Sequence, residues 1–257
     1  MIRKRYVDGP FGQIHVRESG WDAEGVPLVC LHATAYSSRS FEPLIRAFGD
    51  TRHVIAIDLP GYGESDAPQA KPDMAGYAGA IADAIGDRPV DLFGYHTGVY
   101  VAAELALLYP ARVRCMTFMG VPYFQAMDFE HWRARLATPH MLGDTLDQFD
   151  ERWDYLVANR PAGVSLARGF GNFVDELKAW PNGFWAHEAM FAWNSDARLP
   201  KIDCPVTILN PDGHLADASR IAAGLIPCAR VVELPRLSGA VLENNAGEIA
   251  ALIPSEA

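Results

Sequence analysis

A turn with a glycine at each end holds the residue best suited to chemistry in this sequence. It reads Gly94-Tyr95-His96-Thr97-Gly98, between an apolar run and a helical pattern that begins with small residues. His96 therefore stands at the N-terminus of a helix, where the positive end of the helix dipole favours a neutral imidazole. A neutral imidazole can act as a base, a hydrogen-bond donor or, less commonly, a nucleophile. We predict His96 as an acid–base residue.

Other polar residues also follow apolar runs. His32 and His214 each come after such a run, and Asp212 lies just before His214. Carboxyl ends of parallel strands share one edge of a sheet, where ligands bind. We therefore predict His96, His214 and Asp212 as catalytic residues. His32 is a candidate binding residue, although a structural role in its loop is the default expectation. The three histidines with Asp212 also allow a metal site, but their spacing is not local, so we expect no metal.

Hydroxyl groups and aromatic rings near these positions are candidates for substrate contacts. The candidates are Thr34, Tyr36, Ser37, Thr97, Trp185 and His187. Two alternatives remain open. Ser37 can instead cap the helix that follows it, and Trp185 and His187 can instead belong to a small core of their own segment.

Apolar runs rich in β-branched residues alternate with helical patterns along the chain. The runs cover residues 27–31, 53–57, 90–93, 113–119, 205–209 and 229–234. The helical patterns cover residues 40–48, 77–85, 99–109, 218–225 and 242–253. Runs that are apolar almost throughout suit parallel strands covered on both faces, so the alternation predicts a doubly wound α/β sheet. Residues 4–7 and 13–18, around a Gly9-Pro10 turn, predict an antiparallel hairpin at the sheet edge.

The alternation stops in residues 121–199, which hold five of the six tryptophans. Prolines and glycines interrupt helical stretches such as residues 150–158. We predict a helical lid in this interval, inserted into a core made of residues 1–120 and 200–257. The aromatic residues indicate either an apolar covered pocket or the lid's own core.

Composition and charge narrow the functional classes. The chain has 257 residues, 49% of them hydrophobic, and a formal net charge of -10. A basic surface for nucleic acid is therefore not expected, and we see no apolar stretch long enough to span a membrane. We predict a cytoplasmic protein with a small-molecule substrate and with neither nucleic acid nor membrane as a partner. A monomer and a dimer remain equally open.

Three motifs resemble those of the α/β-hydrolase superfamily. The turn around His96 has the strand-turn-helix context of its nucleophile elbow, residues 31–38 are similar to its His-Gly oxyanion loop, and residues 58–66 are similar to its D-x-P-G-x-G-x-S turn. The resemblance covers most of the chain and implies a mostly parallel sheet of about eight strands with an inserted helical lid. It also implies an oxyanion hole made by backbone N–H groups of Thr97 and of Ala33 or Thr34.

This chain departs from the superfamily at each catalytic position. His96 stands where the nucleophilic serine is usual, as in a subgroup whose elbow carries histidine. The usual place of the acid falls at Gly213 or His214, with Asp212 slightly early, and Gly239 stands where the general-base histidine is usual. A Ser-His-Asp mechanism therefore cannot be transferred to this chain.

These residues predict a cofactor-independent enzyme that acts on a small apolar or aromatic carbonyl or ester compound. His96 and a backbone oxyanion hole suit proton transfer beside a carbonyl group, so lyase, isomerase or cyclase chemistry is favoured over ordinary ester hydrolysis. The alternative is a catalytically inactive protein that kept the pocket and binds a ligand or a partner.

Overall fold

The computed structural model describes residues 1–124, 126–139 and 143–255. Its centre is an eight-stranded sheet in the order β1-β2-β4-β3-β5-β6-β7-β8. The strands are β1 (Arg3–Gly9), β2 (Gly12–Ser19), β3 (Leu28–Leu31), β4 (Val54–Ile57), β5 (Val90–Tyr95), β6 (Val113–Met119), β7 (Val206–Asp212) and β8 (Ala229–Ser238). This architecture confirms the predicted α/β-hydrolase fold.

Strand direction follows the predicted pattern. β1 and β2 form an antiparallel hairpin at the sheet edge, and β2 pairs antiparallel with β4. Every other pairing, from β4 across to β8, is parallel. The loops that follow β3, β5, β6, β7 and β8 therefore leave the sheet at one edge, where a site can be assembled from distant parts of the chain.

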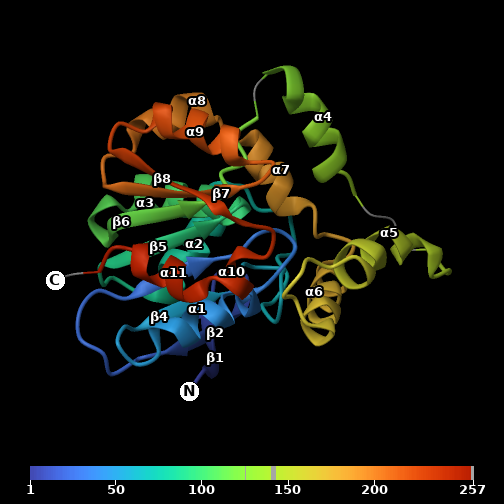
Figure 1. The fold of residues 1–257 in the computed structure, drawn as a ribbon, viewed down its shortest axis with the longest axis horizontal. Helices are drawn as coiled ribbons and strands as arrows, with labels where there is room; N and C mark the ends of the chain where they lie inside the picture. The colour runs from blue at the N-terminus through green and yellow to red at the C-terminus, as the bar shows by residue number, and fades with distance from the viewer. Residues whose placement is uncertain (125, 140–142, 256–257) are drawn as a thin grey trace.

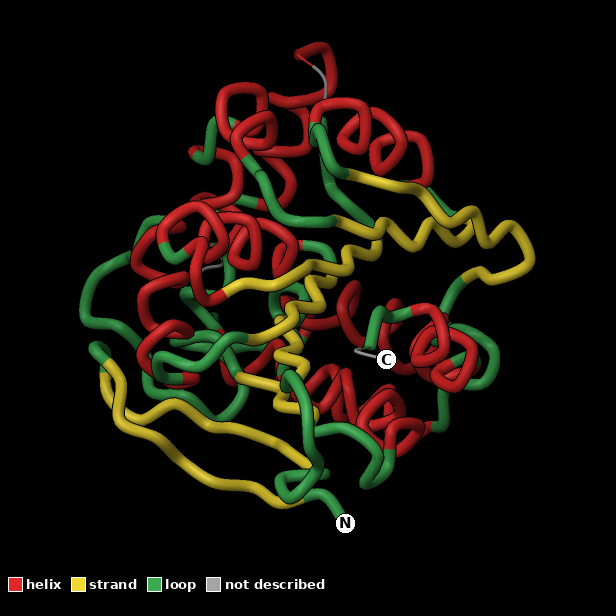
Figure 2. Tube along the Cα trace, turned by 90° about the vertical axis from the view of Figure 1, so that its left-hand side faces the viewer, coloured by secondary structure: helices red, strands yellow, loops and turns green. Residues whose placement is uncertain are grey.

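Helices cover both faces of the sheet (Figure 2). The core helices are α1 (Glu42–Phe48), α2 (Met74–Ile85), α3 (Thr97–Leu108), α9 (Ala216–Leu225), α10 (Val241–Asn244) and α11 (Ala246–Leu252). Side chains of α2, α3 and α9 share one buried apolar cluster, and those of α1, α10 and α11 share another. The single helical pattern predicted for residues 242–253 is two helices, separated at Asn245, whose backbone angles are not helical.

The chain between β6 and β7 is helical, and we call it the insertion. It contains α4 (Ala126–Leu136), α5 (Asp150–Trp153), α6 (Leu166–Ala179), α7 (Trp185–Ala192) and α8 (Ser195–Arg198). A π-helical turn at Asp154–Ala158 continues α5. In Figure 1, α4, α5 and α6 lie to the right of the α/β core. Among the described residues, no helix is long and apolar enough to cross a membrane.

Candidate active site

The turn between β5 and α3 places His96 at a sharp corner of the backbone. His96 has φ 50° and ψ −116°, and it is the only residue other than glycine with positive φ in the described part of the chain. Gly98 makes the corner possible, because a Cβ there would lie 2.0 Å from the carbonyl oxygen of Leu31. The close approach of α3 to β3 thus needs a glycine after the apex, as the sequence motif indicates.

The His96 ring faces a chamber of about 230 Å³, which we call the elbow chamber. Gly120, directly after β6, makes room for the ring, since a Cβ there would lie 2.8 Å from Nε2 of His96. The ring of Tyr95 also packs against the His96 ring, with ring centroids 4.4 Å apart. The chamber is lined by Tyr95, His96, Met119, Gly120, Tyr155, Pro161, Asn210, Pro211, Asp212, Gly213, His214, Leu215, Ala216, Gly239 and Val241.

His96 is held in its neutral form. Its pKa is lowered from 6.5 to about 3, chiefly because burial disfavours the charged imidazolium, and further because His214 and His187 lie near it. Neither ring nitrogen forms a hydrogen bond with another described residue. A neutral imidazole whose nitrogens are not used by the fold is available to a substrate.

The loop after β7 brings two of the predicted catalytic residues to the same chamber. Asp212 and His214 both line it and are both exposed. The rings of His96 and His214 have centroids 6.2 Å apart. Asn210, which is buried, donates from Nδ2 to Oε2 of Glu233 at 2.9 Å, and this bond orients its amide at the chamber wall. The sequence-predicted trio of His96, His214 and Asp212 is therefore assembled in space.

The structure gives His32 its default structural role and corrects its listing as a candidate binding residue. Its side chain is fully buried, with Nδ1 2.9 Å from the carbonyl oxygen of Ala33 and Nε2 accepting from the N–H of Leu59 at 2.9 Å. Both nitrogens are thus used by the fold, and Nε2 joins the loop after β3 to the loop after β4. This use also excludes His32 from a metal site with His96 and His214. Among the described residues, no group of three or more potential ligands is placed to hold a metal ion.

Ser37 is also not placed as a substrate contact. Its hydroxyl accepts from the N–H of Arg39 at 3.3 Å, as a helix cap, and donates to Oδ2 of Asp175 at 2.7 Å. Asp175, which is buried, also pairs with Arg39. Ser37 therefore attaches α6 of the insertion to the core, and the capping alternative was the correct one.

The remaining polar candidates of this loop differ in position. Tyr36 lines a second chamber, which adjoins the elbow chamber. The Thr34 hydroxyl is buried beside the hydroxyl of Tyr62 and does not line either chamber. The Tyr62 hydroxyl in turn donates to the carbonyl of Gly183 and accepts from the N–H of Ala186.

Backbone N–H groups near the elbow suit an oxyanion. Thr97 is the first residue of α3, so its N–H belongs to the helical turn that has no acceptor within the helix. The Thr97 side chain is buried, so its contribution is its backbone rather than its hydroxyl. Ala33, also buried, lies in the loop after β3, which approaches Gly98. These are the elements that the superfamily resemblance assigns to the oxyanion hole.

Of the two candidates in α7, one lies near the elbow. His187 lines a neighbouring pocket together with Ala35 and is close enough to His96 to affect its pKa. Trp185 is half-buried and is not among the residues that line the elbow chamber. Sequence reasoning missed Tyr95, Tyr155 and Pro161 in the chamber. Tyr95 could have been found from its place beside the apex, but Tyr155 and Pro161 belong to the insertion and carry no local signal.

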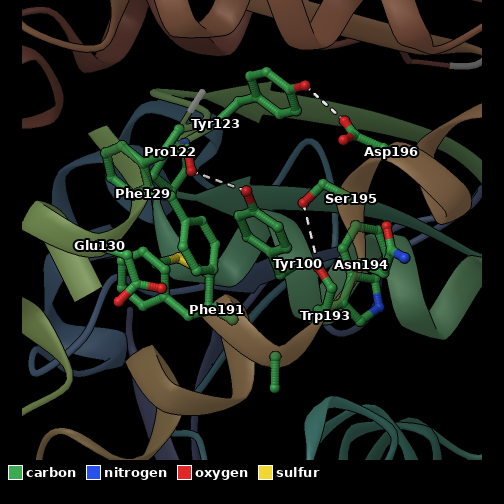
Figure 3. Close-up of a pocket in the computed structure, with 13 residues that line it drawn as sticks. Tyr100, Pro122, Tyr123, Phe129, Glu130, Phe191, Trp193, Asn194, Ser195 and Asp196 are labelled. Atoms are coloured by element: carbon green, nitrogen blue, oxygen red, sulfur yellow. Dashed lines mark hydrogen bonds between the residues drawn. The ribbon is translucent and has the colours of Figure 1, made fainter. Parts of the chain in front are cut away.

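A larger pocket, of about 440 Å³, lies away from the elbow and shares no lining residue with the elbow chamber. We call it the aromatic pocket, and Figure 3 shows it. It is lined by Tyr100, Pro122, Tyr123, Phe124, Phe129, Glu130, Met190, Phe191, Ala192, Trp193, Asn194, Ser195 and Asp196. Its polar groups bind one another: Tyr100 donates to the carbonyl of Pro122 at 2.9 Å, and Tyr123 donates to Asp196 at 2.6 Å.

The fold and the elbow together define an α/β hydrolase, and comparison with known proteins agrees. The profile of the alpha/beta hydrolase fold family matches residues 26–209. The chain therefore belongs to this family.

Among curated relatives, a pimeloyl-[acyl-carrier protein] methyl ester esterase of Neisseria meningitidis serogroup C is 31% identical over 186 residues, which cover 70% of this chain and 72% of the relative. An (E)-2-((N-methylformamido)methylene)succinate hydrolase of Acinetobacter baylyi is 30% identical over 42% of this chain and 41% of its own. The crystal structure of an epoxide hydrolase from Vigna radiata superposes with a TM-score of 0.78 and 17% identity, over 98% of this chain and 96% of that chain. The first two support an enzyme of the hydrolase class, and the third shows the fold.

Proposed function

We propose that this protein is a cofactor-independent enzyme that transfers a proton beside the carbonyl group of a small apolar or aromatic substrate. His96 is the acid–base residue. The observation that carries the proposal is a neutral histidine in a positive-φ backbone conformation at the apex of the elbow, facing a chamber. Such a conformation costs about 1–3 kcal/mol and is retained mostly at functional sites.

In this reaction the substrate carbonyl oxygen lies against the N–H of Thr97 and an N–H of the loop at Ala33. A nitrogen of His96 takes a proton from the carbon beside the carbonyl group, and the C–H electrons move to the carbonyl oxygen as an enolate forms. The enolate charge stabilises the imidazolium and so opposes the effect of burial on the pKa of His96. The imidazolium then returns the proton to carbon or to a leaving group. Whether the reaction is an isomerisation, a cyclisation or an elimination depends on which atom receives this proton.

The residues around His96 support this chemistry over an acyl-enzyme mechanism. No serine stands at the apex, and Gly239 offers no side chain where a general-base histidine is usual. His214, exposed in the same chamber, adds a second imidazole beside the substrate. The names of the curated relatives describe a methyl ester and a substituted succinate, both of which are carbonyl compounds, and this supports the substrate class.

The proposal is tested by hydrogen exchange at carbon in D₂O, followed by proton NMR, with butan-2-one, 4-phenylbutan-2-one and methyl phenylacetate. We expect the wild-type protein to accelerate loss of the signal beside the carbonyl in at least one compound. His96→Asn, which tolerates positive φ, should reduce this rate by about 10²- to 10⁴-fold. His131→Asn is the matched control, because His131 is an exposed histidine of α4. Exchange at the wild-type rate in His96→Asn would overturn the proposal.

A second candidate is a ligand-binding protein without catalysis. The observation that favours it is the combination of Gly239 at the usual place of the base with exposed side chains at Asp212 and His214. Binding of the three compounds without exchange or product in the wild-type protein would select this candidate.

A further inference from the structure

The elbow chamber adjoins the second chamber. The second chamber has a volume of about 160 Å³ and lies between the loop after β3, the insertion and α10. Both chambers share lining residues, namely Tyr95, Tyr155, Pro161, Gly239 and Val241. The second chamber is therefore the cavity next to a ligand that lies in front of His96.

Gly239 lies at the junction of the two chambers. It follows β8 directly and has φ +66°, and a Cβ there would find only Pro161 Cβ nearby, at 3.7 Å. A side chain at this position, such as the histidine that is usual in the superfamily, would stand in the space that joins the chambers. The absence of that side chain leaves this space open.

The second chamber suits an uncharged group. Leu156, Val164 and Leu242 supply apolar wall. Its two charged lining residues, Arg168 and Glu243, neutralise one another in an ion pair of 2.5 Å. Burial raises the pKa of Tyr95 to about 12, so this phenol is neutral. An apolar cavity of about 150 Å³ is large enough to bind benzene, so the second chamber has the size of one aromatic ring.

We infer that Gly239 is a specificity-determining residue and that the substrate has two parts. A carbonyl group lies at His96, and an uncharged group the size of an aromatic ring passes Gly239 into the second chamber. The position of the carbonyl group rests on the proposed function, whereas the preference for a ring-sized arm rests on the shape and charge of the second chamber.

The inference is tested by measuring binding with saturation-transfer NMR and titration, for butan-2-one, 4-phenylbutan-2-one and 4-(4-carboxyphenyl)butan-2-one. Burial of the phenyl ring should make 4-phenylbutan-2-one bind about ten- to hundred-fold more tightly than butan-2-one. The added carboxylate should remove most of this gain, because Arg168, the described cation that lines the second chamber, is already paired with Glu243. Equal affinity for the two uncharged ketones would overturn the inference.

Gly239→Asn places a side chain in the junction, and asparagine tolerates positive φ. This variant should lower the affinity for 4-phenylbutan-2-one at least ten-fold and change the affinity for butan-2-one by less than about two-fold. Gly86→Asn is the matched control, because Gly86 has φ +72° with no atom near its Cβ, at the end of α2. Val164→Trp fills the second chamber from the insertion and should cause the same selective loss of affinity for 4-phenylbutan-2-one. This second variant tests the inference if Gly239→Asn does not fold. Unchanged binding of 4-phenylbutan-2-one in the folded variants contradicts the role of Gly239.

Binding is measured without turnover, so the two proposals fail separately. His96→Asn should keep the preference for the phenyl ketone while it loses hydrogen exchange. If His96→Asn loses hydrogen exchange but neither it nor the wild-type protein prefers the phenyl ketone, the proposed function stands and the two-part substrate is rejected.

Discussion

The elbow chamber and the aromatic pocket differ in what their polar groups do. The aromatic pocket is the larger, at about 440 Å³ against about 230 Å³, but its polar side chains are bound within the protein. Trp193 Nε1, for example, donates to the buried Glu104 at 2.8 Å. In the elbow chamber the ring nitrogens of His96 have no hydrogen-bond partner among the described residues. Size alone therefore does not mark the site, because chemistry needs polar groups that the fold has left unused.

The largest effect should come from His96→Ser, which restores a G-x-S-x-G motif. Hydrogen exchange should fall by about 10²- to 10⁴-fold, because the acid–base group is gone. No esterase activity should appear, because Gly239 supplies no base for the new serine. The measurements are the exchange assay and release of 4-nitrophenol from 4-nitrophenyl acetate. A burst of 4-nitrophenol would show that another residue acts as the base and would weaken the contrast between the two pockets.

A substitution in the aromatic pocket should lower the stability of the protein and leave its activity unchanged. Trp193→Ala removes a buried ring and leaves Arg198 as the partner of Glu104 among the described residues, so the free energy of unfolding should fall by about 3–5 kcal/mol. Chemical denaturation followed by circular dichroism measures this loss. Hydrogen exchange by the folded variant should stay within about two-fold of wild type, since no chamber residue changes. A large loss of exchange in the folded variant would mean that the two pockets are coupled.

A smaller loss of stability is expected from Ser37→Ala. The variant leaves the buried Asp175 without its hydroxyl donor, which should cost about 1–3 kcal/mol in the free energy of unfolding. Because Ser37 attaches α6 to the core, limited proteolysis should cut the insertion faster than in wild type. The affinity for 4-phenylbutan-2-one should not change, and a strong decrease would return Ser37 to the list of substrate contacts.

The smallest change should be the response of exchange to pH. A histidine with the usual pKa would be about 97% protonated at pH 5, and catalysis by its neutral form would fall about thirty-fold between pH 8 and pH 5. Because the pKa of His96 is lowered to about 3, its neutral form should persist, and the rate should change less than about two-fold. Stability behaves differently, because His96 binds a proton below pH 6.5 in the unfolded chain but stays neutral in the folded chain. The free energy of unfolding should therefore decrease as pH falls below 6.5. Circular dichroism at each pH separates the two effects, and a decrease in rate centred near pH 6.5 would place the functional proton elsewhere.

Much of the fold could be predicted because it rests on local patterns. The apolar run at residues 113–119 is β6 without a change of boundary, and the alternating residues 4–7 and 13–18 lie within the edge hairpin. Gly94 and Gly98 indicated the elbow, because a Cβ at Gly94 would meet Val99 of α3 and a Cβ at Gly98 would meet Leu31 of β3. Each of these signals lies within a few neighbouring residues.

The candidate site was predicted less completely, because its side chains are chosen by contacts between distant segments. His32 and Ser37 have residue types that suit a substrate, but the fold uses them for Leu59 and Asp175. Tyr155 and Pro161 reach the chamber from the insertion, and nothing in their own sequence indicates this. A hydroxyl or an imidazole has the same sequence signal whether its partner is a ligand or another loop.

The sequence by itself determined a doubly wound α/β sheet and a glycine-flanked turn with histidine at its apex, because hydrophobic periodicity and glycine spacing act over short distances. Its motifs also resembled those of the α/β hydrolases. Only the tertiary structure decided which polar groups stay available. Ser37 donates a hydrogen bond to Asp175, 138 positions away in the sequence. His96 instead lies beside Gly120 and lines a chamber that Gly239 also lines without a side chain. The physical reason is that burial and hydrogen bonding between distant segments determine which groups are used by the fold and which remain for a substrate.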